Sequence, residues 1–269
     1  MLRTRVLTAL VLLALLLAVL FWLPTAVGVL FLALVVLVGA WEWAAFAGLT
    51  RPGARLLYVL ATGALCALAW SATTSSSGFV AGMALAALWW AVAFLWLALK
   101  PHAVNRLTAG AAGLLVLVPA WLGLARLLAL APERRGAWLL LYMLLLVWAA
   151  DIGAYFAGRR FGRLKLAPEV SPNKTWEGVI GGTVLGLVVA LVGARVFAAP
   201  AVSFVGLGLA VVGTSMVGDL TESMFKRYAH LKDSGSLLPG HGGVLDRIDS
   251  ITSAVPFYVL GLSWTGMLA

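Results

Sequence analysis

Residues Val6–Leu23 read VLTALVLLALLLAVLFWL, an apolar stretch long enough to cross a lipid bilayer as a helix. Similar runs follow one another along nearly the whole chain of 269 residues, which is 63% hydrophobic and only 11% charged, with a mean hydropathy of +1.04. This composition excludes an ordinary soluble domain. The sequence therefore predicts an all-α, polytopic integral membrane protein.

We place about nine transmembrane helices, because prolines such as Pro24, Pro101 and Pro200 fall in the breaks between apolar runs. The expected spans are Val6–Leu23, Thr25–Ala47, Leu56–Ser71, Phe79–Leu99, Leu107–Leu128, Ala137–Ala157, Gly178–Phe197, Val202–Thr221 and Ile251–Leu268. The single cysteine, Cys66, excludes a disulfide within the chain.

The basic residues are distributed unevenly over the predicted loops. With the N-terminus in the cytoplasm, 15 of the 19 Lys and Arg residues lie on the cytoplasmic side, and Arg126, Arg134, Arg135 and Arg195 lie on the other side. An excess of basic residues in cytoplasmic loops is the usual orientation signal of membrane proteins. We therefore expect an N-in, C-out topology. The net charge of +9 records this topology, so no nucleic-acid partner is predicted.

The acidic residues divide the chain into two regions. Residues 1–150 contain only Glu42 and Glu133, whereas residues 151–249 contain the other eight. We expect residues 1–150 to form a multi-span scaffold and lipid-contact region, and residues 151–269 to form a catalytic transmembrane region with cytoplasmic loops. Glu42 stands between two tryptophans near the end of a predicted span, where we expect a structural role.

The first candidate constellation lies at the end of the eighth predicted span. If that span continues as a helix, Asp219, Glu222, Ser223 and Lys226 share one face. A carboxylate in an apolar helix costs about 2.5–3.5 kcal/mol on insertion scales, so it needs a partner. That partner is either a metal ion or Lys226; a solvated helix end with an internal salt bridge is the alternative.

The second constellation is a glycine-rich loop followed by two aspartates. Three glycines flank His241, so the backbone there can approach a ligand closely and its amides can hold an anion. Asp246 and Asp249 share a face of the next predicted helix, so two helices present aspartates to one loop. Carboxylates combined with substrate phosphates are typical of Mg²⁺ sites, whereas a plain polar hairpin is the alternative. His241 is expected to form hydrogen bonds within the loop rather than to bind metal.

The third constellation precedes the seventh span. Asp151 directly follows an apolar run and is expected to face a polar cavity. The basic residues from Arg159 to Lys165 have an adequate explanation as a topology signal. In the stretch SPNKTWEG, the side chains of Ser171, Asn173 and Lys174 are of types that contact phosphate or ribose. The alternative is that this stretch only begins a helix.

Residues Ser223–Asp249 resemble the signature of the phosphatidate cytidylyltransferase family, which makes CDP-diacylglycerol from CTP and phosphatidic acid. The chain matches the signature at Ser223, Phe225, Lys226, Arg227, Lys232, Asp233, Gly235, Leu238, Pro239, His241, Gly242, Gly243, Val244, Asp246, Arg247, Ile248 and Asp249. The Lys165–Pro168 and Ser171–Gly178 segments are also similar to family motifs, although Asn173 stands where many members have lysine. The strong resemblance covers residues 151–249.

The resemblance implies that the phosphate of phosphatidic acid attacks the α-phosphorus of CTP and that pyrophosphate leaves. We expect Mg²⁺, with a second cation as an open alternative, on Asp219, Asp246, Asp249 and Asp151. The expected catalytic residues are Lys226, Lys232, Asp246 and Arg247. The expected substrate-binding residues are Ser171, Asn173, Lys174, Ser223, Arg227, His241, Gly242 and Gly243.

The resemblance also implies a homodimer in the bacterial inner membrane, with its active site facing the cytoplasm. Two other functions were weighed. A CDP-alcohol phosphotransferase would carry an aspartate-rich motif that this sequence lacks. A cation or proton transporter would also retain intramembrane acids, but it would not need the Lys-Asp…His-Gly-Gly loop.

Overall fold

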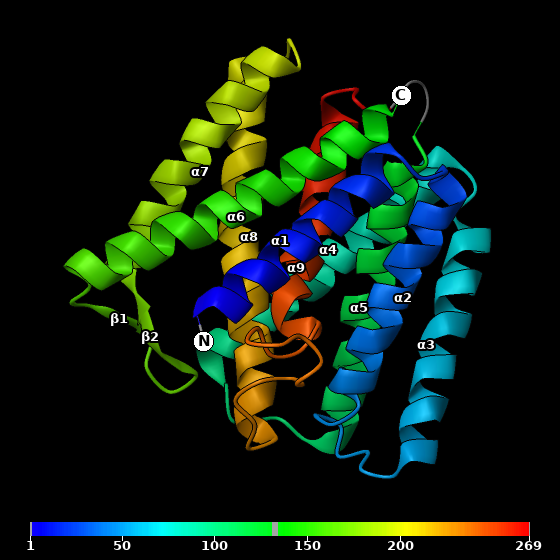
Figure 1. Cartoon of the computed structure of the whole chain (residues 1–269), viewed down its shortest axis with the longest axis vertical. Coiled ribbons are helices and arrows are strands. Elements are labelled where there is room, and N and C mark those ends of the chain that lie inside the picture. The colour runs from blue at the N-terminus through cyan, green and yellow to red at the C-terminus, as the bar shows by residue number, and fades with distance from the viewer. Residues whose placement is uncertain (1, 131–133, 269) are drawn as a thin grey trace.

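A computed structural model of the chain describes residues 2–130 and 134–268, in which nine α-helices and one two-stranded sheet are formed (Figure 1). Pro132 and Glu133 lie outside the described residues. The elements are α1 (Leu2–Phe21), α2 (Thr25–Trp43), α3 (Pro52–Ala72), α4 (Ser76–Leu99), α5 (Arg106–Leu128), α6 (Arg135–Phe161), β1 (Lys165–Ala167), β2 (Ser171–Thr175), α7 (Trp176–Val196), α8 (Ala201–Tyr228) and α9 (Leu245–Trp264).

Eight of these helices are long and apolar enough to cross a membrane, which confirms the predicted polytopic all-α class. Within the described part of the chain, α9 is the one helix that does not combine sufficient length with sufficient hydropathy to cross a membrane. Its first two turns carry Asp246, Arg247 and Asp249, and Pro256 lies farther along it. The ninth predicted span therefore exists as a helix, but it is more polar than the others.

Three predicted boundaries were wrong because polar residues continue the helices beyond the apolar runs. Helix α6 extends past Ala157 to Phe161, and α8 extends past Thr221 to Tyr228. Helix α9 begins at Leu245 rather than Ile251. Hydropathy marks the part of a helix that suits lipid, whereas the backbone hydrogen bonds continue into the polar end. These polar ends carry most of the candidate site residues.

The β1–β2 hairpin between α6 and α7 was not predicted. Its strands are antiparallel, with Lys165 opposite Thr175 and Ala167 opposite Ser171. Thr175 also begins α7, because its hydroxyl accepts a hydrogen bond from the Gly178 amide at 3.2 Å. Strand β2 is thereby fixed to the first turn of α7, at one end of the helix bundle (Figure 1).

Glycines allow the helices around this end to pack closely. A side chain at Gly153 of α6 would collide with the carbonyl oxygen of Gly181 in α7. A side chain at Gly218 of α8 would collide with the hydroxyl of Ser253 in α9. Such small residues bring helix backbones together in membrane proteins. The aspartates of α8 and α9 are consequently held on neighbouring, closely packed helices.

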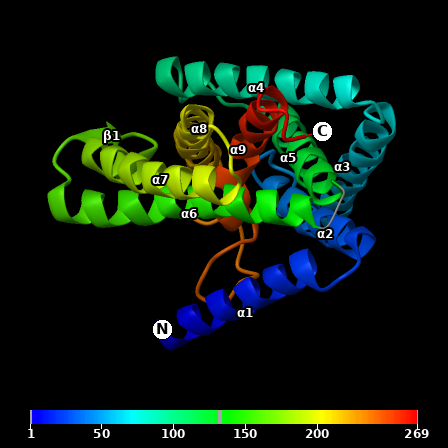
Figure 2. The same cartoon turned by 90° about the horizontal axis from the view of Figure 1, so that it is seen from above.

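Helix α1 lies apart from the other helices when the molecule is seen from above (Figure 2). Most of its side chains are exposed, as expected of a helix in contact with lipid. It reaches the long loop between α8 and α9, where the Thr8 hydroxyl donates a hydrogen bond to the Pro239 carbonyl oxygen at 3.1 Å. Helix α1 therefore covers the outer side of this loop.

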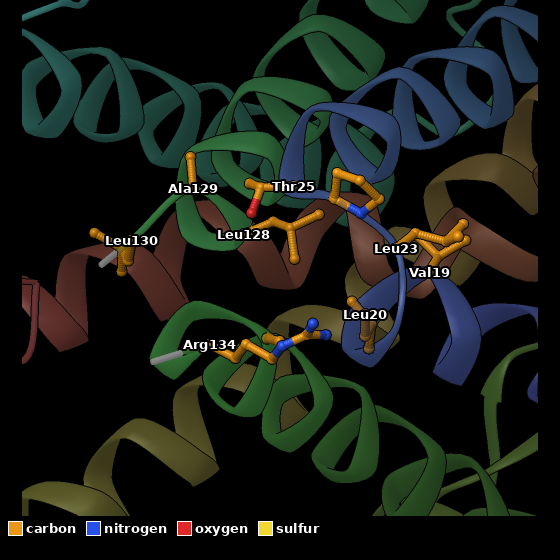
Figure 3. Close-up of a pocket in the computed structure, with 10 residues that line it drawn as sticks. Val19, Leu20, Leu23, Thr25, Leu128, Ala129, Leu130 and Arg134 are labelled. Carbon is orange, nitrogen blue, oxygen red and sulfur yellow. The ribbon is translucent and has the colours of Figure 1, made fainter. Parts of the chain in front are cut away.

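The structure contains three notable cavities. One of about 270 Å³ lies where the turn between α1 and α2 meets the adjoining ends of α5 and α6, with Leu20, Leu128 and Arg134 among its lining residues (Figure 3). Another, of about 340 Å³, is lined by residues that include Arg126 and several hydroxyl groups. No acidic residue in the described part of the chain lines either of these. The third is the largest and contains the charged constellations.

Candidate active site

The charged cavity has a volume of about 720 Å³ and lies between α6, the hairpin, α7, α8 and α9. Its carboxylates come from Asp151, Asp219, Asp233, Asp246 and Asp249. Its cations come from Arg159, Lys174, Lys226 and Arg247. Segments from three sequence constellations therefore meet in one space, and each supplies both signs of charge.

Lys226 of α8 is held between two carboxylates. Its Nζ atom lies 2.7 Å from Asp246 Oδ1 and 3.2 Å from Glu222 Oε1. Lys226 is 8% exposed and Glu222 is 2% exposed. The contact between Lys226 and Glu222 is an ion pair without hydrogen-bond geometry. Within the described residues, neither oxygen of the Glu222 carboxylate has a hydrogen-bond partner. The single ammonium group therefore contacts both carboxylates, beside the cavity that Lys226 and Asp246 line.

Asp246 organises the loop between α8 and α9. Its Oδ2 atom accepts hydrogen bonds from the Ser234 amide, the Ser234 hydroxyl and the Gly243 amide, each at 2.9 Å. Its other oxygen accepts from Lys226. Both oxygens are thus engaged within the protein. The assignment of Asp246 to metal stays a prediction, and the contacts favour a role in shaping the loop.

Glu42, which lies in a distant part of the chain, caps the N-terminus of α9. Its carboxylate accepts hydrogen bonds from the Leu245 amide at 2.8 Å, the Val244 amide at 3.1 Å and the Ser234 hydroxyl at 3.1 Å. A negative charge at a helix N-terminus is favourable, because unpaired amides point toward it. The structural role expected for Glu42 agrees with these contacts, but its partners were not predicted.

Asp219 joins α8 to the hairpin. Its Oδ2 atom lies 2.6 Å from Lys174 Nζ on β2, and its Oδ1 atom accepts a hydrogen bond from the Ser223 hydroxyl at 3.4 Å. The charge of Asp219 also acts on Asp151 and Asp249, across the same cavity. Asp219 therefore lies at the centre of the carboxylate group, with Lys174 beside it.

The carboxylates of the cavity are spread over its wall rather than gathered around one point. Over residues 2–130 and 134–268, no three His, Cys, Asp or Glu side chains lie close enough together to hold a metal ion. The ammonium of Lys174 occupies the position beside Asp219 that a bound cation would need. Asp151, Asp219 and Asp249 nevertheless offer hard carboxylate oxygens, the donors that Mg²⁺ prefers, to one cavity, and they would have to move closer together to share an ion. Metal binding at these residues stays a prediction.

The structure brings only part of the predicted catalytic and substrate-binding sets to the cavity. Asn173, Lys174, Lys226, Asp246 and Arg247 line it, as do the predicted metal residues. Within the described residues, the lining does not include Ser171, Ser223, Arg227, Lys232, His241, Gly242 or Gly243.

Several of these outlying residues have structural contacts instead. The Arg227 Nε atom donates a hydrogen bond to the Val170 carbonyl oxygen at 3.1 Å, which ties α8 to the hairpin. The Gly243 amide binds Asp246, and Gly242 has a φ of +80°, which favours glycine. Lys232 is exposed in the loop. Their assignment to substrate stays a prediction.

Several residues of the cavity wall were missed, among them Asp233 of the loop before α9. Tyr155 and Arg159 of α6 line the cavity one and two turns beyond Asp151. The sequence analysis interprets Arg159 as part of a topology signal, and it predicts that the sixth span ends at Ala157. A helix extended by one turn would have placed Asp151, Tyr155 and Arg159 along one stripe at intervals of four residues. The helical spacing was therefore the signal that could have identified them.

The fold and the cavity define a class of protein: a helical membrane protein with a charged site, suited to phosphate groups, at one end of its bundle. A sequence model of the cytidylyltransferase family matches residues 3–264, and the chain belongs to this family.

Individual relatives agree with this family. A phosphatidate cytidylyltransferase of Pseudomonas aeruginosa is 47% identical over an alignment that covers 98% of this chain and 97% of the relative. A phosphatidate cytidylyltransferase of Haemophilus influenzae is 42% identical, with coverage of 96% and 97%. One of Bacillus subtilis is 44% identical over about half of each chain, 46% and 47%. The chain is thus similar to the first two of these enzymes along essentially its full length.

Proposed function

We propose that the charged cavity transfers CMP from CTP to phosphatidic acid, giving CDP-diacylglycerol and pyrophosphate. The two full-length relatives at 42–47% identity support this reaction. The protein is accordingly a nucleotidyltransferase of phospholipid biosynthesis with transmembrane helices. The active site is assigned to this cavity because five aspartates and four cations meet there, in a volume of about 720 Å³.

The chemistry requires positioning and charge compensation more than a strong base. A phosphomonoester has a second pKa of about 6, so the lipid phosphate is already largely a dianion at neutral pH. One of its oxygens forms a bond to the α-phosphorus of CTP, while the bond from that phosphorus to the bridging oxygen of the β-phosphate breaks. Both electrons of the broken bond leave with pyrophosphate. The protein must hold two anions in line and stabilise the departing one.

The cations of the cavity suit this task. Lys226 is held between Asp246 and Glu222, and Lys174 is paired with Asp219, so both ammonium groups lie at the cavity. Arg247 lines the same space from the first turn of α9. Guanidinium and ammonium groups form strong charge-assisted hydrogen bonds to phosphate oxygens. We assign Lys174, Lys226 and Arg247 to the phosphates of the bound nucleotide, with Asn173 at the same edge.

Asp219 and Asp249, with Asp151 beside them, are the residues that would hold Mg²⁺. The ion would neutralise phosphate charge and stabilise the leaving pyrophosphate when bound. Lys174 must then turn away from Asp219. Its released ammonium would become available to a phosphate oxygen, so the exchange keeps the charges of the cavity compensated.

The same proposal includes the surroundings of the enzyme. CTP is a water-soluble nucleotide, so we place the cavity end of the bundle toward the cytoplasm and the protein in the bacterial inner membrane. The split of basic residues, 15 against 4, supports this orientation. A homodimer is proposed on the family resemblance, and light scattering of the purified protein in detergent tests it.

A direct assay tests the reaction. The purified protein in detergent micelles is mixed with CTP, Mg²⁺ and phosphatidic acid, and both pyrophosphate and CDP-diacylglycerol are measured. We expect the two products in equal amounts, and none when phosphatidylcholine replaces phosphatidic acid. Ion flux in vesicles without nucleotide turnover would overturn the proposal in favour of a transporter.

A further inference from the structure

Arg159 differs from the two lysines of the cavity because it has no carboxylate partner. Lys174 and Lys226 each lie within 2.7 Å of an aspartate oxygen. Arg159 instead contacts a tyrosine: its Nη1 atom donates a hydrogen bond to the Tyr155 hydroxyl at 2.8 Å. Among the described residues no acid pairs with Arg159, so its guanidinium keeps most of its donors for a ligand.

The position of Arg159 on α6 is the second observation. Gly153 faces α7, and the helix closes tightly against that neighbour. Farther around the helix, Ile152 is 51% exposed and Phe156 is 66% exposed, as expected of side chains that face lipid in a membrane span. Tyr155, 57% exposed, and Arg159 lie between this face and the cavity, and they line the cavity. The cavity thus reaches the lipid-facing side of α6 at these two residues.

We propose that Arg159 binds the phosphate of the lipid substrate at this edge, and that phosphatidic acid enters the cavity from the bilayer past Tyr155 and Arg159. The identity of the lipid rests on the proposed function. The acyl chains remain beside Ile152 and Phe156, while the phosphomonoester moves toward the nucleotide phosphates. A guanidinium suits this ligand, because its planar donors match two phosphate oxygens at once.

Arg160 provides a matched control. It has the same charge, is adjacent in sequence and belongs to the same basic run, but it does not line the cavity, and its guanidinium lies 5.5 Å from the Phe161 ring centroid. A topology signal or general attraction to anionic lipid would depend on both arginines. A binding site for the lipid phosphate depends on Arg159 alone.

The test compares Arg159→Gln with Arg160→Gln in mixed micelles. The surface fraction of dioleoyl phosphatidic acid is varied at saturating CTP, and CTP is then varied at saturating lipid. We expect Arg159→Gln to raise the apparent KM for phosphatidic acid at least about tenfold, as for a lost charge-assisted hydrogen bond, and to leave the KM for CTP within about twofold. Arg160→Gln should stay near wild type, and Arg159→Lys should recover part of the loss. Equal effects of the two glutamine variants, or a raised KM for CTP alone, would overturn the proposal.

A binding measurement separates this inference from the reaction itself. The thermal shift of the detergent-solubilised protein is recorded with dioleoyl phosphatidic acid and with dioleoylglycerol, both without CTP. We expect the phosphate-containing lipid to stabilise wild type and Arg160→Gln, but not Arg159→Gln. If this pattern holds while CTP turnover is absent, the proposed reaction fails and the lipid site stands. If turnover is present and Arg159→Gln binds phosphatidic acid like wild type, the site fails and the reaction stands.

Discussion

The ammonium of Lys226 contacts two carboxylates, so its removal affects folding as well as chemistry. The sequence places Lys226 and Lys232 together among the expected catalytic residues. The structure separates them, because Lys226 is buried and Lys232 is exposed. Removing one member of a buried ion pair leaves an uncompensated charge, at a cost of about 3–5 kcal/mol.

We therefore predict that Lys226→Ala loses both activity and thermal stability, whereas Lys232→Ala keeps its melting temperature in detergent. Thermal unfolding of the two purified variants measures the difference. The double variant Lys226→Met/Asp246→Asn removes the partner carboxylate together with the ammonium group, so Asp246 no longer leaves an unpaired buried charge. It should therefore regain part of the stability lost in Lys226→Ala. Two single variants of equal stability would contradict the buried arrangement.

The aspartates also divide into two groups at the level of single residues. Asp246 has both oxygens engaged by Lys226, Ser234 and Gly243, whereas Asp219 has a lysine beside it that a metal can replace. We predict that Asp219→Asn and Asp249→Asn raise the Mg²⁺ concentration needed for half-maximal activity. Asp246→Asn should lower the maximal rate at all Mg²⁺ concentrations, because it disturbs the loop. Mg²⁺ titrations of the three variants check this, and three identical titration curves would exclude the division.

The sequence predicted the composition of the site better than its internal contacts. Helical spacing placed Asp219 and Lys226 on one face, and the structure bears this out because α8 continues to Tyr228. The pairing of Asp219 with Lys174 could not be predicted, because it joins two segments whose relative position depends on the whole bundle. A periodicity argument describes one helix at a time.

Among the elements, α8 and α9 depend on a close crossing at Gly218. A methyl group there would collide with the Ser253 hydroxyl, whereas the same group at Gly213, also in α8, would meet no atom within 4 Å other than those of its own stretch of helix. Inserting volume into a tight contact costs about 1–3 kcal/mol. The two glycines thus form a matched pair on one helix.

We predict that Gly218→Ala lowers both stability and activity, because it pushes Asp249 away from Asp219. Gly213→Ala should be neutral or slightly stabilising, since alanine is the better helix former. Melting temperatures and turnover rates of the two variants in the same detergent provide the measurement. A Gly218→Ala enzyme that works like wild type would show that the crossing has room to adjust.

The β1–β2 hairpin is the element that sequence patterns did not reveal. Its strands are short, and Pro172 lies within β2, which argued against a strand. The hairpin is held instead by tertiary contacts, such as the hydrogen bond from Arg227 to Val170. Short strands without a hydrophobic alternation leave no periodic signal, whereas the long apolar helices were identified because their length alone distinguishes them.

At the scale of the whole molecule, the loop between α4 and α5, the hairpin and the loop before α9 lie at one end of the bundle, and the C-terminus lies at the other (Figure 1). A polar contact of 2.9 Å between His102 Nε2 and Glu169 Oε2 joins two of these segments. We predict that reporter fusions after Pro101 and within residues 161–174 report the cytoplasm, and that a fusion after Ala269 reports the opposite side. Alkaline phosphatase and green fluorescent protein fusions give complementary signals. A cytoplasmic C-terminus would mean that α9 does not cross the bilayer.

The cap that Glu42 places on α9 has a consequence for the order in which the protein is made. Glu42 and Leu245 are 203 residues apart, so α2 has left the ribosome long before α9 is synthesised. Among the described helices, α9 is the one that is not apolar enough to count as a candidate membrane span. Its first turn contacts Glu42 and Lys226, which belong to segments made earlier. Helix α9 thus brings in Asp246, Arg247 and Asp249 together, after α1 to α8 have been made. A nascent chain that has made only α1 to α8 lacks these three residues of the cavity, so its site is incomplete.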